Sequence, residues 1–330
     1  MKVCICGVGA IGGFIGTRLA LTGRCEVSAV ARGATLAALR SHGLRLRQGG
    51  TLLSAPVRAS DDPAALGVQD LVVIAVKGPA LGAVAERIAP LIGPRTVVLP
   101  AMNGVPWWFG AGAPALGDAP LQSIDPGGHI AAALPVAQVI GCVVHASTWT
   151  SEPGLVEHKM GQGLIIGEPL SGESERVQTL AALLRGAGFD TTVSADVRRD
   201  LWYKLWGNMT MNPITAITGA TVDRVLDDPL TRHFCSAAMA EAAAVGAKIG
   251  CAIEQSPEDR HQITRKLGAF KTSMLQDVEA GRPIELDALV SVVCEIAQRV
   301  GVATPFIDAL LGLARLHGRV HGLYPEPQAA

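Results

Sequence analysis

The sequence feature that most constrains the fold is the glycine-rich stretch GVGAIGG at residues 7–13. It follows the apolar run KVCICG at 2–7, which is typical of a buried strand, and it opens a stretch with helical periodicity that reaches Thr22. Its glycines fit the spacing G-x-G-x-x-G, which lets a backbone turn tightly and approach a pyrophosphate at a helix N-terminus. The motif alone is weak, and a structural glycine turn is the alternative. In this strand–turn–helix setting it predicts a dinucleotide-binding domain.

Short β-branched runs alternate with helical stretches through the first half of the chain. After the first strand, such runs cover residues 26–32, 70–77, 96–104, 139–149, 161–169 and 191–196, with a helical stretch at 174–187. Apolar runs of this kind are typical of strands buried on both faces. The alternation predicts the α/β class, with a Rossmann-like, doubly wound parallel sheet. Residues 110–135, rich in Ala, Gly and Pro, predict an irregular excursion.

The character of the sequence changes near Ala195. Long amphipathic segments rich in Ala, Leu, Glu, Gln and Arg then cover residues 197–212, 229–249, 257–276, 285–300 and 305–317. We therefore predict an all-helical C-terminal domain. The predicted division is a dinucleotide-binding domain at 1–195 and a helical domain for substrate binding or dimerisation at 196–330. The tail PEPQAA at 325–330 is expected to fray.

Composition narrows the class of protein. Hydrophobic residues make up 49% of the chain and charged residues 17%, which is enough for a large core and unlike a disordered chain. The net charge of −1 gives no electrostatic basis for binding nucleic acid or an anionic membrane. The longest apolar runs, such as LVVIAV at 71–76, have the length of strands, and no secretory signal is visible. We expect a cytoplasmic protein that does not span a membrane.

The cysteines and histidines predict no metal site. The seven cysteines are scattered and form no C-x-x-C pair, so we expect free thiols in a reducing compartment. The histidines show no spacing that would pair two of them with an acidic third ligand. The adjacent Trp107 and Trp108, with the apolar helical domain, suggest a surface for a possible homodimer.

Four of the predicted strands end in glycine or polar residues, namely Gly7, Arg32, Lys77 and Asn103. Ligands of doubly wound sheets bind at the carboxyl ends of the strands. An acidic residue after the second strand would favour NAD, whereas the guanidinium of Arg32 suits a 2′-phosphate and predicts NADP(H). Lys77 is predicted to contact a phosphate or ribose, and the Asn103 amide to face the nicotinamide end. An ordinary surface charge and an Asn-Gly turn are the respective alternatives.

A second constellation lies in RRDLWYKLWGNMTMNPIT at 198–215. Lys204 and Asn208 are four residues apart and share a helix face, and Asn212 lies one further turn along. Asparagine is a poor helix former, so two of them among large apolar residues favour an active site over a solvated polar stripe.

The same segment predicts its own packing. Leu201, Leu205 and Met209 form a separate stripe, which is the predicted packing face. Pro213 removes a backbone donor and disfavours helical geometry at Asn212, so we expect a kink that turns Asn212 inward.

In these motifs the chain resembles the ketopantoate reductase family (2-dehydropantoate 2-reductase), NADPH-dependent enzymes of pantothenate synthesis. The resemblance covers nearly the whole chain, and its specific part is the Lys-x3-Asn-x3-Asn helix combined with SMLQDVEAGRPIELD. The motifs that carry it are GVGAIGG, ARG, VKGP, NG, SEPGLVEH with IGEP, WYKLWGNMTMNPIT and SMLQDVEAGRPIELD. The family fold, a Rossmann-like domain followed by a helical domain, agrees with the predicted division.

The resemblance implies roles for individual residues. Lys204 matches the proton donor, which also contacts substrate, and Asn208 and Asn212 match substrate-binding amides. Ser273 matches a hydroxyl that binds the substrate carboxylate, and Glu285 a carboxylate that contacts the cofactor. The remaining expected cofactor contacts are Gly7, Val8, Gly9, Ala10, Ile11, Gly12, Arg32, Lys77, Asn103 and Ala146.

The implied reaction is hydride transfer from NADPH to the ketone carbon of a 2-oxo acid, with 2-dehydropantoate reduced to pantoate on the route to pantothenate and CoA. Two departures bear on the substrate. Some members carry a further substrate-binding asparagine where this chain has 220–223, including Val222, and VPWWF at 105–109 is bulkier than is typical. A reductase of another 2-oxo acid or imine, and a non-catalytic NADPH-binding sensor, are the alternatives.

Overall fold

The computed structural model describes residues 1–326, so residues 327–330 of the tail that was expected to fray lie outside the described residues. The chain forms two compact units. The first contains Met1–Gly112 and Gly128–Asp200, and the second contains Ala113–Gly127 and the chain from Leu201 onward. The structure thus divides the chain between Asp200 and Leu201, and it groups 113–127 with the second unit.

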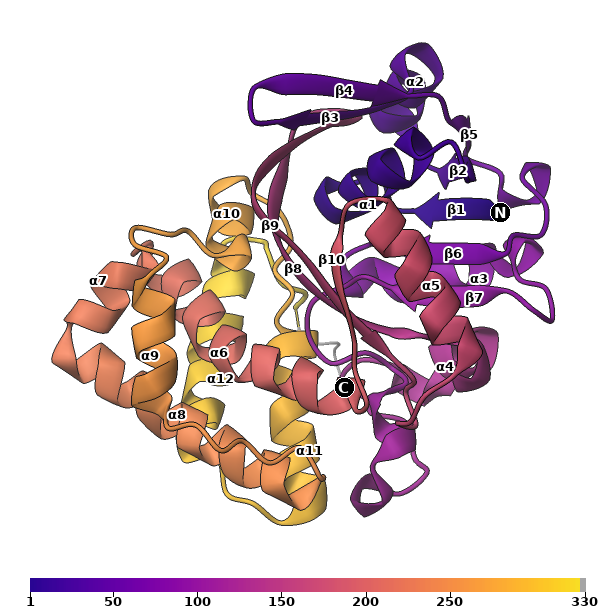
Figure 1. The fold of residues 1–330 in the computed structure, drawn as a ribbon. Helices are drawn as coiled ribbons and strands as arrows, with labels where there is room; N and C mark the ends of the chain where they lie inside the picture. Colours follow the sequence, from indigo (N-terminus) through magenta and orange to yellow (C-terminus); the bar gives the residue numbers. More distant parts are fainter. Residues whose placement is uncertain (327–330) are drawn as a thin grey trace. The chain divides into compact units, whose positions relative to one another are not determined.

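The first unit contains the predicted parallel sheet. Its five strands lie in the order β5-β2-β1-β6-β7, and every neighbouring pair is parallel (Figure 1). The strands are β1 (Lys2–Cys6), β2 (Glu26–Val30), β5 (Arg58–Ser60), β6 (Leu71–Ile74) and β7 (Val97–Pro100). Helices α1 (Ala10–Leu21), α2 (Gly33–His42) and α3 (Leu81–Arg87) follow β1, β2 and β6 along the chain. The predicted α/β class is confirmed.

A second, mixed sheet was not predicted. Strands β10, β9, β3 and β4 lie side by side in that order, and β8 pairs with β9. Their bounds are β3 (Leu44–Gln48), β4 (Thr51–Ala55), β8 (Gly141–Glu152), β9 (Leu155–Gly167) and β10 (Asp190–Val193). Helix α2 and strands β3, β4 and β5 were not predicted, although LRLRQ at 44–48 alternates apolar and polar residues as a half-buried strand does.

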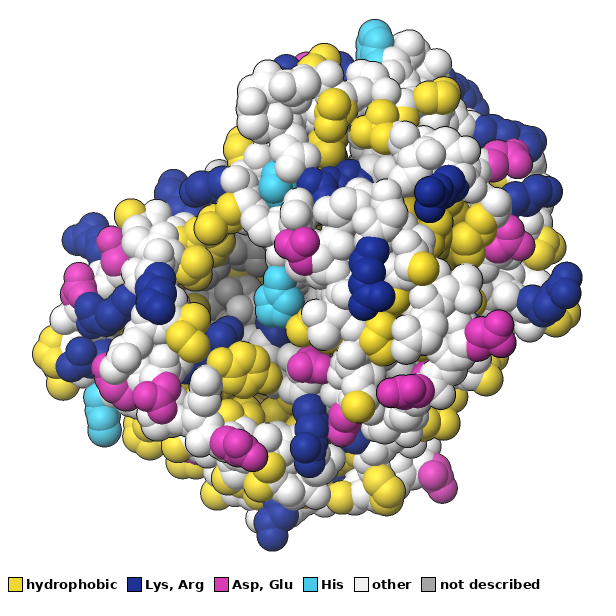
Figure 2. All heavy atoms as spheres, in the orientation of Figure 1, with side chains coloured by type: hydrophobic (Ala, Val, Ile, Leu, Met, Phe, Trp, Pro, Cys, Tyr) yellow, Lys and Arg dark blue, Asp and Glu magenta, His cyan; other side chains and the backbone are white. Residues whose placement is uncertain are grey.

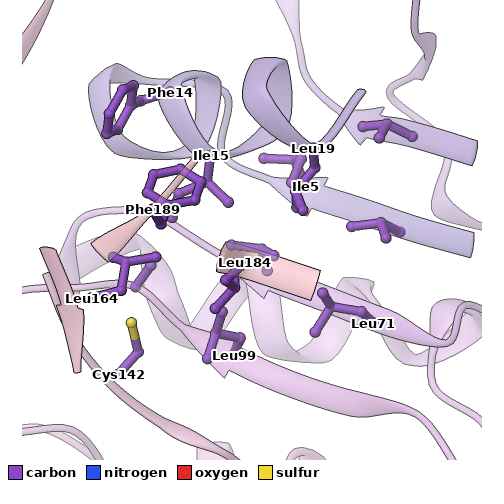
Figure 3. Packing of buried hydrophobic residues seen from close by; sticks show 14 of the residues in the cluster. Ile5, Phe14, Ile15, Leu19, Leu71, Leu99, Cys142, Leu164, Leu184 and Phe189 are labelled. Atoms are coloured by element: carbon purple, nitrogen blue, oxygen red, sulfur yellow. The ribbon is translucent and has the colours of Figure 1, made fainter. Parts of the chain in front are cut away.

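The core of the first unit lies between its two sheets. Helix α1 packs against β1 and β2 and also against β3, β8 and β9, and α5 (Glu175–Gly186) packs against β9 and β10. Figure 3 shows Phe14, Ile15 and Leu19 of α1 among buried residues of both sheets and of α5. Burial of these side chains, each worth about 1.5–3 kcal/mol, accounts for the apolar character of this half of the sequence.

The second unit is helical, as predicted. Its helices are α6 (Val197–Thr218, which enters this unit at Leu201), α7 (Val222–Asp227), α8 (Pro229–Lys248), α9 (Pro257–Arg265), α10 (Ser273–Glu279), α11 (Val292–Val300) and α12 (Pro305–Val320). The prediction of a single helical segment over 257–276 was wrong. Residues 266–272 separate α9 from α10, and among them Gly268 has a φ of +63°. A π-helical turn at Asp287–Ser291 precedes α11.

The segment Ala113–Gly127 joins the helical unit through two side chains of α11. The Glu295 carboxylate accepts hydrogen bonds from the backbone N–H groups of Gln122 and Ser123, both at 2.8 Å. The Arg299 guanidinium donates to the Ala119 carbonyl at 2.7 Å and to Glu295 at 2.6 Å. Burial alone would raise the pKa of Glu295, but the hydrogen bonds from Ser123, Gln122 and Arg299 outweigh it and lower that pKa. The irregular excursion therefore has a defined anchor.

The tryptophan pair does not form a surface. Trp107 and Trp108 are 7% and 2% exposed, and the indole N–H of Trp107 donates to the Leu134 carbonyl at 3.0 Å. The hint of a dimer surface at this pair was therefore wrong. On the visible face of the molecule, positively and negatively charged side chains are interspersed (Figure 2).

All seven cysteines are free thiols, and six of them are buried. Within residues 1–326, no helix combines the length and apolar character needed to cross a membrane.

Candidate active site

The three motif glycines of the loop between β1 and α1 differ in whether the protein itself requires glycine at their position. Gly7 has a φ of +94°, which side chains rarely adopt, and a Cβ on Gly12 would lie 2.0 Å from the Gly7 carbonyl oxygen. Gly9, the N-cap of α1, has an ordinary φ of −90°, and a Cβ there would meet no atom within 4 Å. The protein itself therefore does not require glycine at position 9.

This open space fits a dinucleotide. Gly9 has no side-chain cap, and the first turn of α1 contains no acidic residue. The first N–H groups of a helix have no intrahelical partner and attract anions. A pyrophosphate held there would occupy the space beside Gly9 and exclude a side chain. The loop residues Gly7, Val8, Gly9, Ala10, Ile11 and Gly12 thus form a cradle of the kind that the motif predicts.

The other strand-end residues lie along the same edge of the sheet. Arg32, Lys77 and Asn103 follow β2, β6 and β7, which flank β1 in the order β2-β1-β6-β7, all parallel. Carboxyl ends of parallel strands meet at one edge, so these residues share that edge with the glycine loop. Arg32 is exposed and is the N-cap of α2, and Lys77 is the N-cap of a short 3₁₀ turn. Ala146, on β8, lies at an irregularity in the pairing with β9.

In the second unit, α6 buries its leucine–methionine stripe and leaves Lys204 and Asn208 half-buried. Leu201, Leu205 and Met209 are buried, which confirms the predicted packing face. The indole N–H groups of Trp202 and Trp206 donate to the Ala242 and Met239 carbonyls of α8, at 3.2 and 2.7 Å. Lys204 and Asn208 are half-buried. These contacts hold α6 so that the face carrying Lys204 and Asn208 is not the packing face.

Asn212 and Ser273, which are far apart in the sequence, lie together. The Asn212 amide donates to the Ser273 hydroxyl at 3.4 Å, and the Thr215 and Thr272 hydroxyls are 2.7 Å apart. Asn212 is 5% exposed. The helix does not end at Pro213, as the predicted segment did, but continues to Thr218. Asn212 is therefore oriented by α10, which packs beside it.

Glu285 lies on the segment between α10 and the π-helical turn. It is half-buried, whereas its neighbours Ile284 and Leu286 are 2% and 0% exposed. Lys204, Asn208, Asn212, Ser273 and Glu285 all belong to the second unit. The predicted cofactor-loop residues and Arg32, Lys77, Asn103 and Ala146 belong to the first.

One arginine beside α6 was not predicted. The Arg260 guanidinium stacks on the Tyr203 ring, 4.7 Å from its centroid, and a Cβ on Gly207 would lie 3.0 Å from Arg260 Nε. Glycine inside a helix usually needs such a packing reason, and this was the available signal. Arg260 thus covers α6 at Tyr203 and Gly207, the residues that directly precede Lys204 and Asn208.

The departures from the family pattern lie in apolar surroundings. Val222, within the segment 220–223 where the resemblance led us to expect a departure, is 2% exposed and belongs to a cluster with Met211, Ile214 and Leu226. Among residues 1–326, no three or more His, Cys, Asp or Glu side chains are grouped to hold a metal ion.

The fold and the loop define a dinucleotide-binding α/β protein with a helical second unit, and comparisons with known proteins specify its family. The sequence pattern of the ketopantoate reductase PanE/ApbA family matches residues 3–171, and that of its C-terminal part matches residues 196–318. The chain belongs to the ketopantoate reductase family, which is a family of NAD(P)-dependent reductases.

Individual relatives span the same length. The chain is 43% identical to the 2-dehydropantoate 2-reductase of Mesorhizobium japonicum, covering 98% of this chain and 100% of that protein. A solved structure from Ralstonia solanacearum MolK2, provisionally named a ketopantoate reductase, is 56% identical with a TM-score of 0.93, over 98% and 99% of the chains. D-Mandelate dehydrogenase, solved with NADH and anilino(oxo)acetate, shares the fold at 20% identity and a TM-score of 0.83, over 98% and 100% of the chains.

Substitution by alanine should affect cofactor binding at Gly9 and protein stability at Gly12. Gly9→Ala adds a methyl group into open space and should lower the free energy of unfolding by about 1 kcal/mol or less, the usual cost of alanine at a helix N-cap, while it weakens binding of the nicotinamide dinucleotide by about tenfold or more. Gly12→Ala forces a Cβ against the Gly7 carbonyl and should destabilise the protein by about 1–3 kcal/mol. Denaturant unfolding and fluorescence titration with NADPH measure the two effects.

Gly110→Ala is the matched control, because a Cβ at Gly110 would also meet no atom within 4 Å and this glycine lies outside the loop. It should change neither quantity. Unchanged NADPH affinity in Gly9→Ala would contradict the placement of the pyrophosphate at this loop.

Proposed function

We propose that this protein reduces the ketone of a 2-oxo acid with NADPH, with 2-dehydropantoate as the substrate and pantoate as the product, in the synthesis of pantothenate and CoA. The observation that carries the proposal is the joining of two distant motifs, Lys-x3-Asn-x3-Asn on α6 and Ser-Met on α10, by the Asn212–Ser273 contact. The 43% identical Mesorhizobium relative that bears the name of this activity supports it. Because the seven cysteines are free thiols, we also propose the reducing cytoplasm as its location.

Each residue has a chemical task in this proposal. NADPH would supply the hydride to the carbonyl carbon. Charge then develops on the substrate oxygen, and the Lys204 ammonium would stabilise it and donate the proton. The amides of Asn208 and Asn212 would orient the substrate without adding charge, and the Ser273 hydroxyl would donate to the carboxylate. The amide–hydroxyl contact between Asn212 and Ser273 limits the freedom of both groups before substrate binds.

The decisive experiment measures NADPH oxidation with 2-dehydropantoate and with a panel of small 2-oxo acids. We expect the highest kcat/KM with 2-dehydropantoate. Lys204→Ala should lower kcat by about 100-fold or more, because it removes the proton donor. Lys248→Ala, which changes an exposed lysine at the end of α8, is the control and should leave kcat unchanged.

Each other outcome selects an alternative. A kcat of Lys204→Ala within about threefold of the unchanged protein would remove Lys204 from the proton-transfer step. A much higher kcat/KM with another 2-oxo acid would assign a different substrate to the same scaffold. NADPH binding without turnover on the whole panel would favour the sensor.

We further propose that NADP(H), rather than NAD(H), is the cofactor. The support is Arg32, an exposed guanidinium at the position after β2 where NAD-binding proteins usually carry an acidic residue. A 2′-phosphate would accept charge-assisted hydrogen bonds from this side chain. Lys77 and Asn103 at the same sheet edge would contact other parts of the cofactor, as would Ala146 and, from the second unit, Glu285.

Replacement of Arg32 separates the two cofactors. Arg32→Ala should raise the KM for NADPH by about tenfold or more and change the KM for NADH little, because only NADPH has the phosphate. Arg40→Ala is the control, since Arg40 is an exposed arginine of the same helix. Equal effects of Arg32→Ala on both cofactors would contradict the assignment.

We propose a homodimer formed through α12. Phe306, Ala309, Leu313, Leu316 and Val320 repeat at heptad spacing and are all exposed, with Leu313, Leu316 and Val320 at 57%, 61% and 72%. Apolar residues at this spacing form the seam of paired helices. A second copy of the same helix, related by a two-fold axis, would cover each of these side chains with its own counterpart.

A double substitution on the α12 seam tests the dimer. The double variant Leu313→Glu/Leu316→Glu places two charges in the seam. In sedimentation velocity we expect it to sediment as a monomer, whereas the unchanged protein sediments as a dimer. The monomer should stay folded, which a cooperative thermal transition would show. Leu170→Glu, which changes a residue of the first unit that is 61% exposed, is the control and should leave the mass unchanged. A monomeric unchanged protein would refute the proposal.

A further inference from the structure

The chain after α12 returns to the segment that carries Glu285. The Leu323 carbonyl accepts a hydrogen bond from the Ile284 N–H at 3.0 Å, and the Tyr324 hydroxyl donates to the Asp287 carboxylate at 2.6 Å. Leu323 is 5% exposed. One contact lies one residue before Glu285, and the other lies two residues after it. Residues 323–324 therefore hold both sides of the Glu285 position.

Glycine at position 318 makes this return possible. A Cβ on Gly318 would lie 2.7 Å from the Tyr324 Cβ and 3.1 Å from the Ile284 Cδ1. The Leu323 N–H also donates to the Gly318 carbonyl at 2.7 Å, and Arg319 lies over the Tyr324 ring, 5.8 Å from its centroid. Residues 323–324 are thus packed against α12 at a fixed place.

The backbone after Glu285 departs from ordinary helical geometry. Asp287 begins the π-helical turn, and the Leu286 carbonyl accepts hydrogen bonds from the N–H groups of Val290 and Ser291, at 2.8 and 3.3 Å. Such turns are rare and often occur at functional sites. The Ser291 hydroxyl also donates to the Asp287 carboxylate at 2.9 Å, so this carboxylate has two hydroxyl donors.

We propose that Tyr324 is a positioning residue for Glu285, and that it sets cofactor affinity by fixing the irregular turn on which Glu285 is mounted. This inference rests on the proposed role of Glu285 as a cofactor contact. Tyr324 does not touch the reacting atoms. It acts through Asp287, because the hydroxyl–carboxylate bond fixes the first residue of the turn, while the Leu323 carbonyl fixes the backbone at Ile284.

The Tyr324 phenol keeps the proton that it donates in this hydrogen bond. Burial, together with the neighbouring Asp287 carboxylate, raises the pKa of Tyr324 to about 12. The phenol therefore remains a donor across the pH range of an assay near neutrality. A charge-assisted bond of this kind is stronger than one between neutral groups.

The test is a double-mutant cycle read by NADPH affinity. Tyr324→Phe removes the hydroxyl and keeps the ring, and we expect the Kd for NADPH to rise about threefold to tenfold, the factor expected for one lost hydrogen bond. Glu285→Ala should raise the Kd at least as much. In the Glu285→Ala background, Tyr324→Phe should have no further effect within about twofold, because the group that it positions is gone.

Ser236→Ala is the matched control. It removes a hydroxyl that lies 3.0 Å from the His261 ring, in the same unit, and it should lower the thermal midpoint without changing the Kd for NADPH. If Tyr324→Phe yields too little folded protein, Asp287→Asn gives the same readout. It keeps an oxygen acceptor but removes the charge, and we expect a smaller rise in the Kd that is likewise lost in the Glu285→Ala background.

The outcomes separate this inference from the proposed function. If Glu285→Ala raises the Kd but Tyr324→Phe only lowers the thermal midpoint, Tyr324 is a structural residue and the inference is overturned. Additive effects of the two substitutions would overturn it as well. If Glu285→Ala itself leaves the Kd unchanged, the cofactor role of Glu285 fails, and the inference fails with it.

Discussion

The close packing of α1 is the constraint on which the first unit depends. A Cβ at Gly16 would lie 2.9 Å from Ile5 of the parallel sheet, and one at Gly13 would lie 2.6 Å from Val156 of the mixed sheet. Both sheets therefore reach the helix at distances that only glycine allows. Gly12 meets the Gly7 carbonyl in the same way, so the packing of α1 and the shape of the cofactor loop have one common cause. Among the glycines of the loop and of α1, only Gly9 would meet no atom of the protein, and that is the position at which we expect a pyrophosphate.

In the second unit, the equivalent constraint is the burial of one face of α6. Two tryptophans hydrogen-bond to α8 carbonyls, and a leucine–methionine stripe is buried. This packing sets the rotation of the helix, and the rotation decides where Lys204, Asn208 and Asn212 point. Pro213 lies within α6, which continues to Thr218, and the Asn212 amide donates to Ser273 on α10.

The fold itself does not select a substrate. D-Mandelate dehydrogenase shares it at 20% identity. The discrimination therefore has to come from side chains, and the resemblance led us to expect departures from the family pattern at 220–223 and in VPWWF. Val222, Trp107 and Trp108 are all buried, so these residues act on the packing within their own units. The substrate panel is the direct measure of their effect.

The sequence by itself determined the parallel sheet, the helical second half and the residue types of the candidate site, because periodicity, glycine spacing and strand-end position are local patterns. It also indicated which face of α6 is buried. Tertiary structure alone decided the rest. The mixed sheet arises because β9 pairs with β3 and β10, from more distant segments, as well as with its hairpin neighbour β8. Residues 113–127 join the helical unit through Glu295 and Arg299. The Asn212–Ser273 contact and the clamp of Tyr324 on Asp287 are likewise long-range. Such contacts depend on packing between segments remote in sequence, which no local pattern encodes.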